Sequence, residues 1–576
     1  MKLYHWITLL FLMSASVFFN LQGINWGLPS KERTDLVFPE QFHTESFYSL
    51  MKQTREEIYK FSEGSPIGRL KNSSLSLTPI LQSMGVQENG NLFFNGDEKI
   101  LANFIRPYLL RSNHTDEQMT IASLSGMYPK SFDFNPRIFP YGGVYIYGMG
   151  VWLGLSHVFD FIKISHDLNF YFQYSEEMAK IFVAGRLLNI FFSTFTMIII
   201  FTIAKKIYSI RTAILSILFF AISPAMIFQT HIMKPYTMAT TFAMLCVYYS
   251  LVIITTTPSI KNYVLCGIFA GLTIGTMSTY GIIILAPLFA HFSVSKLVNK
   301  KLVYCCLASL VTFLITNPYW LLKFNDMLWE MKGSAGCYAS GNLLAIVGFF
   351  VHQLPIGVPV SLLLLCFLGV ILSIFQKENW NIPLISVSVV PLIIFGFLLR
   401  GYEPSMHNTR FLLPWISILL ILAARFVDIF LNKKYVSFFI VLLIIFAIIQ
   451  STLSSAICIK NFLIDSSANS TRLEAGRWIS DNIPANSIIG TNYMPEPAHF
   501  PPFDFSKYKM EVMQRYNLKK LPEYFICVNE VPKEILNNKN YTLTQSFKPL
   551  ESIFGFRFSM GSTHINSSVY ILKRIS

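Results

Sequence analysis

The chain has 576 residues, of which 53% are hydrophobic and 14% are charged, and its formal net charge is +14. About a quarter of the residues of an ordinary soluble protein are charged, so this composition excludes a single soluble domain. The lysines and arginines stand in small clusters between apolar stretches, which indicates membrane topology rather than a surface that binds nucleic acid.

Apolar stretches of about 17 to 25 residues recur from Ile7 to Cys458, and a helix of that length crosses a hydrocarbon core of about 30 Å. With basic clusters such as Lys205–Lys206 and Lys433–Lys434 on the cytoplasmic side, the sequence predicts about eleven transmembrane helices. The amino terminus is then inside and the carboxyl terminus outside. The predicted spans lie near residues 6–22, 179–204, 212–232, 236–256, 262–278, 279–295, 302–320, 355–375, 381–399, 411–430 and 435–457.

The first of two large outer segments runs from residue 23 to residue 178. It is polar and rich in turn residues, but the stretch from Tyr141 to Val158 is aromatic, glycine-rich and apolar. Counting that stretch as a span would place Lys205 and Lys206 outside. We therefore predict a helix that lies in the membrane interface.

The second outer segment begins at about residue 461 and reads as a small α/β domain. A helix is predicted at 472–482, and strands are predicted at 487–493, 524–530 and 569–573. The sequence thus predicts a transmembrane domain, 1–460, that includes the outer loop 23–178, and a small soluble outer domain, 461–576.

Unusual polar residues fall at the outer ends of the predicted spans and in the first loop. A cleft with paired acids, a large covering loop and cations at helix ends is suited to an anionic lipid headgroup beside a general base. Each residue also has an ordinary explanation, as a solvated surface acid, a membrane anchor or a core histidine. The candidates are Asp116, Glu117, His231, Lys234, His407 and Arg410.

The order of several short motifs resembles the GT-C glycosyltransferases, in particular the protein O-mannosyltransferases and aminoarabinose transferases that use polyprenyl-phosphate sugars. The motifs extend over nearly the whole chain. They are Asn25–Pro29, Thr115–Glu117, Phe134–Arg137, Tyr141–Tyr145, Ala184–Leu188, Ile222–Pro224, Asn317–Tyr319, Arg410–Pro414, Arg477–Ile479 and Asn482–Pro484.

The resemblance implies an α-helical, polytopic GT-C-like fold and transfer of a sugar, of hexosyl or mannosyl type, from a polyprenyl-phosphate donor to an acceptor. The first-loop acid of the family is the base or positions the acceptor, a role that falls on Asp116 with Glu117 beside it. Asp97–Glu98 is a second acidic pair, but it lies farther from the interfacial helix. Arg410, Lys234, His231 and His407 are the candidates for binding the donor phosphate.

The family also often has an acid at the outer end of the third span, but residues 231–236 contain no carboxylate. We therefore expect neither an essential metal nor another cofactor. The resemblance places the chain in a bacterial inner membrane with its active site outside. The alternatives are a transporter or flippase, an O-antigen ligase or polymerase that uses diphosphate-linked glycans, and a non-catalytic scaffold. The sequence identifies neither the sugar nor the acceptor.

Overall fold

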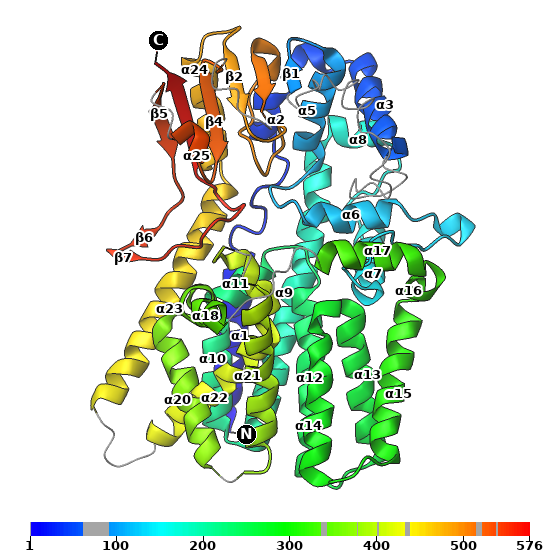
Figure 1. The fold of residues 1–576 in the computed structure, drawn as a ribbon, viewed down its shortest axis with the longest axis vertical. Helices are drawn as coiled ribbons and strands as arrows, with labels where there is room; N and C mark the ends of the chain where they lie inside the picture. Colours follow the sequence, from blue (N-terminus) through cyan, green and yellow to red (C-terminus); the bar gives the residue numbers. More distant parts are fainter. Residues whose placement is uncertain are drawn as a thin grey trace.

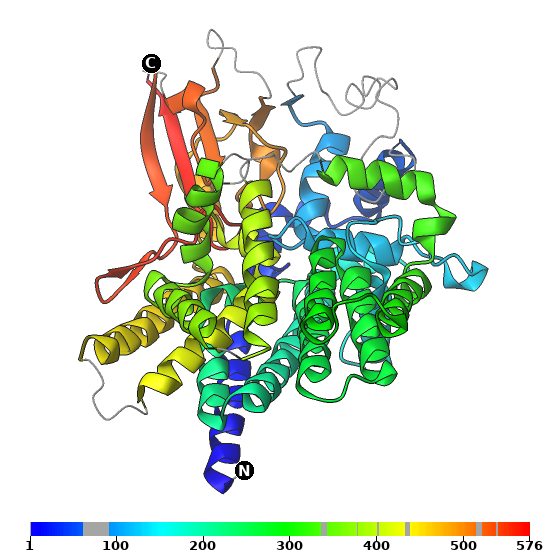
Figure 2. The ribbon, with the colours of Figure 1, turned by 60° about the horizontal axis from the view of Figure 1, so that its bottom comes forward.

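The computed structural model describes residues 2–61, 92–335, 343–376, 378–399, 403–431, 438–513, 521–536 and 540–575. A helical bundle forms one end of the molecule and a mixed sheet with short helices forms the other (Figure 1). The amino terminus lies at the bundle end and the carboxyl terminus beside the sheet, and the tilted view agrees (Figure 2). We call the end of the bundle that faces the sheet its outer end.

The bundle makes the protein a multi-pass helical membrane protein. Six helices in the described ranges are long and apolar enough to cross a membrane, and two bent pairs raise the number to at most eight. The six are α1 (Leu3–Leu21), α9 (Ser175–Ile207), α12 (Tyr236–Thr255), α21 (Asn381–Leu398), α22 (Leu413–Leu431) and α23 (Phe438–Asp465).

The predicted number of about eleven spans is not confirmed, although a helix is present in each predicted span. Three of these helices are only about 17 residues long or interrupted: α13 (Ile260–Thr276), the segment Ser278–Val294 that contains α14 (Leu285–Val294), and α15 (Lys300–Thr316). α13 packs closely on α15, since a Cβ atom at Gly267 would lie 2.1 Å from the Cys305 carbonyl oxygen. Small residues permit such close helix packing in membranes. The basic residues Lys377, Lys433 and Lys434 lie outside the described residues.

Breaks in two spans shape the outer end of the bundle. α10 (Ile210–Ala221) and α11 (Pro224–Thr230) meet at a bend of 59°, and the segment Leu343–Gly357 meets α20 (Val360–Phe375) at 116°. Pro224 is the first residue of α11, where the missing N–H of proline is tolerated and a new helix direction begins. The turn after α11 carries Lys234, which contacts Asp116 of the first outer segment.

The interfacial stretch predicted at 141–158 forms α7 (Gly143–Val158). Its first turn sits on the outer ends of α13 and α15, because a Cβ atom at Gly142 would lie 1.9 Å from the Gly275 carbonyl oxygen and the Gly143 N–H donates to Asn317 Oδ1 at 2.7 Å. Val158, at its other end, is 73% exposed. The close packing of the start of α7 against the outer ends of α13 and α15 is consistent with a helix in the membrane interface.

The predicted α/β outer domain is present, but its sheet includes a strand from the first outer segment. The strand order is β1-β3-β2-β4-β8-β5, and β1 pairs antiparallel with β3. The strands are β1 (Leu92–Phe94), β2 (Ile488–Thr491), β3 (Lys509–Val512), β4 (Tyr524–Val528), β5 (Tyr541–Phe547) and β8 (Val569–Arg574).

One hydrophobic core joins this sheet to helices of both outer segments. It contains side chains from α3 (Glu45–Phe61), α5 (Glu98–Leu110) and α24 (Thr471–Asn482), such as Phe47, Phe104 and Ile479. α23 continues to Asp465, past the boundary predicted at residue 460. The two outer segments therefore share one packed body above the bundle.

Candidate active site

Asp116 immediately precedes α6 (Glu117–Ser125), but its side chain does not cap that helix. An aspartate at this position commonly accepts hydrogen bonds from the first turn. The carboxylate instead forms an ion pair through Oδ2 with Lys234, and Arg410 Nη1 lies 3.7 Å from the same oxygen. With its side chain 35% exposed, Asp116 keeps access to molecules outside the protein.

The two cations come from segments far apart in the chain. Lys234 belongs to the turn between α11 and α12 and is 2% exposed. Arg410 belongs to η5 (Met406–Phe411), and its carbonyl oxygen accepts a hydrogen bond from the buried Tyr280 hydroxyl. The structure thus brings together three of the six predicted residues. Two positively charged side chains therefore approach one carboxylate oxygen.

The electrostatic environment keeps Asp116 ionised. Burial alone would raise the pKa of its carboxyl, but the nearby charges of Lys234 and Arg410 outweigh burial and hold the pKa well below its ordinary value. Burial lowers the pKa of Lys234 to about 8, although Asp116 opposes this shift. Since a proton acceptor works best with a pKa near the working pH, Asp116 is a weak base while both cations remain on it.

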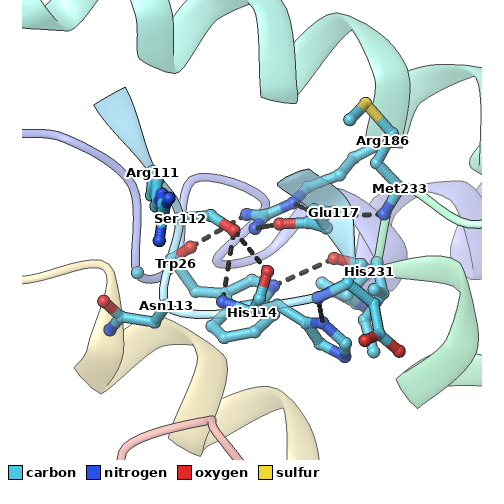
Figure 3. Close-up of polar contacts among 12 residues, drawn as sticks. Trp26, Arg111, Ser112, Asn113, His114, Glu117, Arg186, His231 and Met233 are labelled. Carbon is cyan, nitrogen blue, oxygen red and sulfur yellow. Dashed lines mark hydrogen bonds and ion pairs between the residues drawn. The ribbon is translucent and has the colours of Figure 1, made fainter. Parts of the chain in front are cut away.

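The Glu117 carboxylate points toward Arg186 and the Met233 backbone, as Figure 3 shows, and its side chain is 0% exposed. Its two oxygens accept from Arg186 Nε at 2.9 Å and Nη2 at 2.8 Å, and Oε1 also accepts from the Met233 backbone N–H at 2.7 Å. The carboxylate has no exposed surface on which to meet a substrate. These contacts favour a positioning role for Glu117 and give no support to the prediction that it shares the chemistry of Asp116.

Arg186 is a functional candidate that the sequence reasoning did not select. It lies in α9, and its Nη1 donates to the carbonyl oxygens of Ile24 at 2.6 Å and Trp26 at 2.9 Å. Arg186 therefore contacts the start of the first outer segment directly, and through Glu117 it is connected to α6 and to the turn that contains Lys234. The sequence does contain an indication of its importance, namely an arginine within an apolar span. Charged residues inside transmembrane segments are rare and usually functional.

His231 lies apart from the ion group. Its ring nitrogens are 2.8 Å from the Ile227 carbonyl oxygen and 3.0 Å from that of Gln22, and its ring stacks on Phe462 with centroids 4.1 Å apart. Both nitrogens are occupied by backbone groups. The prediction that His231 binds the donor phosphate therefore finds no support in these contacts.

His407 belongs to a cluster with two other histidines, the buried His114 and His564, which like His407 is half-buried. The ring centroid of His407 lies 4.9 Å from that of His114 and 5.0 Å from that of His564. His114 Nδ1 accepts from the Asp116 backbone N–H at 3.2 Å, and His407 Nε2 accepts from the His564 backbone N–H at 3.3 Å. Both acceptors require neutral rings. His407 thus helps to hold the segment with Asp116.

This histidine cluster predicts a loss of stability in acid. Burial lowers the pKa of His564 to about 3 and the pKa values of His114 and His407 well below their ordinary value. The charges of Lys234 and Arg410 lower the pKa values of His114 and His407 further, and those of Arg472 and Lys234 lower the pKa of His564 further. The unfolded chain then binds more protons than the folded chain below pH of about 6.5, so stability falls as pH decreases, by about 1.4 kcal/mol per pH unit for each histidine.

The measurement is the thermal unfolding midpoint of the purified protein between pH 8 and about pH 5. Substitution His564→Gln should make the dependence on pH less steep, whereas His43→Gln, at an exposed position outside the cluster, should leave it unchanged. Equal pH dependence in the parent and His564→Gln chains would contradict this explanation.

The arrangement of these histidine rings is not one that would hold a metal ion. Over the ranges that the structure describes, no group of three or more His, Cys, Asp or Glu side chains is arranged to hold a metal ion.

A family model described as dolichyl-phosphate-mannose-protein mannosyltransferase matches residues 178–321. This segment is about a quarter of the chain and contains Arg186 and Lys234, but neither Asp116 nor Arg410. Over this segment the match confirms the predicted resemblance to GT-C glycosyltransferases. No protein of curated description matches the sequence.

The chain also matches several solved structures at low similarity. The oligosaccharyltransferase of Archaeoglobus fulgidus, in complex with Zn and sulfate, has 14% identity and a TM-score of 0.39, and 60% of this chain covers 48% of that chain. ArnT from Cupriavidus metallidurans bound to undecaprenyl phosphate has 11% identity and a TM-score of 0.42, with 81% and 95% covered. Arabinofuranosyltransferase AftD from Mycobacteria has 11% identity and a TM-score of 0.37, with 76% and 36% covered. This chain thus spans about half the length of the archaeal enzyme.

Proposed function

We propose that this protein is a membrane glycosyltransferase that moves a sugar from a polyprenyl-phosphate carrier to an acceptor hydroxyl. The observation that carries the proposal is the ion group at the outer end of the bundle, where Lys234 and Arg410 share one oxygen of the partly exposed Asp116. The group offers a proton acceptor and two cations that can bind a phosphate. The match of residues 178–321 to a family named for a dolichyl-phosphate sugar supports the same donor class.

The reaction is an inverting displacement at the anomeric carbon. The acceptor hydroxyl gives its proton to the Asp116 carboxylate as its oxygen bonds to the anomeric carbon. The bond from that carbon to the phosphate oxygen breaks, and its electron pair leaves with the lipid phosphate. Lys234 and Arg410 stabilise the charge that develops on this phosphate, the type of interaction that accelerates such steps most.

Donor binding activates the base in this mechanism. In the unliganded protein Lys234 and Arg410 hold the pKa of Asp116 well below its ordinary value. The donor is a phosphodiester, and its single negative charge competes for the same two cations. When they turn toward the phosphate, Asp116 loses stabilisation of its charged form and its pKa rises. The carboxylate thus becomes a better proton acceptor when a donor is in place.

The proposal also specifies the donor sugar and the membrane in which the protein lies. We propose a hexosyl donor of mannosyl type, and a bacterial inner membrane with the ion group outside. The alternation of basic clusters such as Lys205–Lys206 with the two outer segments supports this orientation. A cysteine introduced at the exposed Asn482 is expected to react with an impermeant thiol reagent from outside intact cells, and one at Lys205 only after permeabilisation. The reverse pattern would contradict the proposed side.

The direct test of the function is consumption of the donor. Purified protein is incubated with radiolabelled polyprenyl-phosphate sugars and, separately, with polyprenyl-diphosphate glycans, and the lipid products are separated. Release of free polyprenyl phosphate from the monophosphate donor supports the proposal. Use of the diphosphate donor alone favours a ligase or polymerase. Movement of intact lipid across a vesicle membrane without cleavage favours a flippase.

Arg410 is expected to bind the donor phosphate. Its planar guanidinium makes paired hydrogen bonds to a phosphate that an ammonium group does not reproduce, whereas a simple membrane anchor tolerates lysine. Arg410→Ala should lose most activity, and Arg410→Lys should keep only part of it, with weaker donor binding as well as slower turnover. Parent-like binding and turnover in Arg410→Lys would move the phosphate site toward Lys234.

A further inference from the structure

A cavity lies between the start of the first outer segment, the outer turns of α9 and the junction of α23 with α24. Its volume is about 440 Å³, which is within the usual range of small-molecule sites. The residues that line it do not include Asp116, Lys234 or Arg410. The lining residues that matter here are Arg33, Asn113, Lys180, Asp465, Ala468 and Arg472.

Arg33 brings a buried positive charge to this pocket. It is 4% exposed, and its terminal nitrogens donate to the carbonyl oxygens of Gly27, Tyr108 and Arg111 and to Asn113 Oδ1. Within the described part of the chain, its Nε has no hydrogen-bond partner and no carboxylate lies within ion-pair distance of the guanidinium. A buried charge normally has a partner of opposite sign.

Arg472 lines the same pocket and is 2% exposed. Its Nη2 donates to the Ala498 carbonyl oxygen at 2.9 Å and to Ser567 Oγ at 2.8 Å, while Nε has no hydrogen-bond partner in the described structure. The nearest carboxylate is that of Asp465, with Oδ1 3.9 Å from Nη1. At this distance the two groups attract each other but make no hydrogen bond.

The buried charges of the pocket therefore do not balance. Among the buried side chains, Arg33 and Arg472 supply two positive charges, and Asp465 supplies one negative charge. The pocket is also lined by three exposed charged residues, Lys180, which already pairs with Glu177 at 2.7 Å, and the acids Glu32 and Glu176. The excess of positive charge is thus confined to the buried part of the pocket. A cavity with an excess buried positive charge and unused N–H groups is suited to an oxyanion, which guanidinium groups bind by charge-assisted hydrogen bonds.

We propose that this pocket binds an anionic group, a phosphate or a carboxylate, at a site separate from Asp116. The anion belongs either to a soluble acceptor or to the headgroup of a membrane lipid. Asn113 connects the two sites, because its side chain contacts both Arg33 and Asp465, at 3.3 Å and 3.4 Å, and it lies three residues before Asp116. An anion in the pocket thus holds a molecule close to the segment that carries the proposed base.

The test measures binding of inorganic phosphate to the full-length purified protein by calorimetry. All chains carry Arg410→Ala, so that the proposed donor site does not add to the signal. Ala468→Trp fills the mouth of the pocket from an exposed position and should abolish binding, whereas Asn469→Trp, at the next exposed position and outside the lining, should not. Phosphate binding that is equal in these two variants would overturn the proposal.

Charge variants test the ligand class. Arg472→Gln should weaken phosphate binding about tenfold, and Asp465→Asn should strengthen it about tenfold, because each changes the pocket by one charge of opposite sign. An increase in affinity cannot result from a misfolded chain. Weaker binding in Asp465→Asn, with parent-like thermal unfolding, would contradict an anion site. The assay involves no turnover, so its result is independent of the proposed glycosyl transfer.

The source of the anion is distinguished by the bilayer. The same titrations are made in nanodiscs of phosphatidylcholine alone and in nanodiscs that also contain phosphatidylglycerol. If a lipid headgroup occupies the pocket, phosphatidylglycerol should suppress phosphate binding at least tenfold. If the anion belongs to a soluble acceptor, the two bilayers should give equal affinity. Absence of pocket-dependent binding in both bilayers would exclude the site.

Discussion

Asp116→Asn is expected to reduce turnover by about 100-fold or more, because the amide does not accept the proton of the acceptor hydroxyl. The same substitution should tighten donor binding. In the parent protein, the Asp116 carboxylate competes with the donor phosphate for Lys234 and Arg410. The substitution removes this negative charge, so both cations should bind the phosphate more strongly. A fall in kcat together with a lower donor Kd is therefore the signature of this mechanism.

The sequence offers a matched control in its other acidic pair. Asp97 caps α5 by accepting from the Ile100 backbone N–H at 2.9 Å, and asparagine is an equally good cap. Asp97→Asn should therefore leave both kcat and donor binding unchanged. Near-normal turnover in Asp116→Asn, with Asp97→Asn also normal, would remove Asp116 from the reaction and leave only its structural contacts.

Local sequence patterns predicted the elements of this fold well. Helices such as Leu3–Leu21 and Tyr236–Thr255 follow directly from apolar length. In the outer domain, the observed helix Thr471–Asn482 and strand Ile488–Thr491 fall within a residue or two of the predicted ranges. These features depend on periodicity and turn residues, which neighbouring positions in the chain determine.

Long-range pairing was not predictable in the same way. The strand Leu92–Phe94 has only three residues, and its partner Lys509–Val512 lies more than 400 residues away. Nothing in its own pattern distinguishes it from a loop. The packing of both outer segments into one core likewise depends on contacts between distant residues, which a single sequence does not reveal.

The candidate site shows the same division. The acidic pair and the cations at helix ends were visible in the sequence, and the structure brings Asp116, Lys234 and Arg410 together. The opposite orientations of Asp116 and Glu117 were not visible, because adjacent residues at a helix start point in different directions. Which of two neighbouring acids meets the solvent depends on Arg186, 69 positions farther along the chain.

Glu117→Gln is expected to destabilise the protein strongly. Glu117 and Arg186 form an ion pair in which both side chains are 0% exposed. Removing one partner leaves a buried charge without compensation, and this typically costs about 3–5 kcal/mol. The thermal unfolding midpoint of the detergent-purified protein should therefore fall sharply. The double variant Glu117→Leu with Arg186→Met should be more stable than either single variant, because neither charge is left alone.

Turnover per folded molecule separates this positioning role from direct catalysis. If Glu117 acts only through Arg186 and the Met233 backbone N–H, the folded fraction of Glu117→Gln should retain most of its turnover, with a larger effect on donor KM, because Met233 directly precedes Lys234. The Asp116→Asn chain should show the converse, with about 100-fold slower turnover. Its loss of stability should be smaller than that of Glu117→Gln, because burial lowers the pKa of Lys234 to about 8 and the lysine left without its carboxylate can release its proton. A Glu117→Gln protein that unfolds like the parent but turns over as slowly as Asp116→Asn would make Glu117 a catalytic residue.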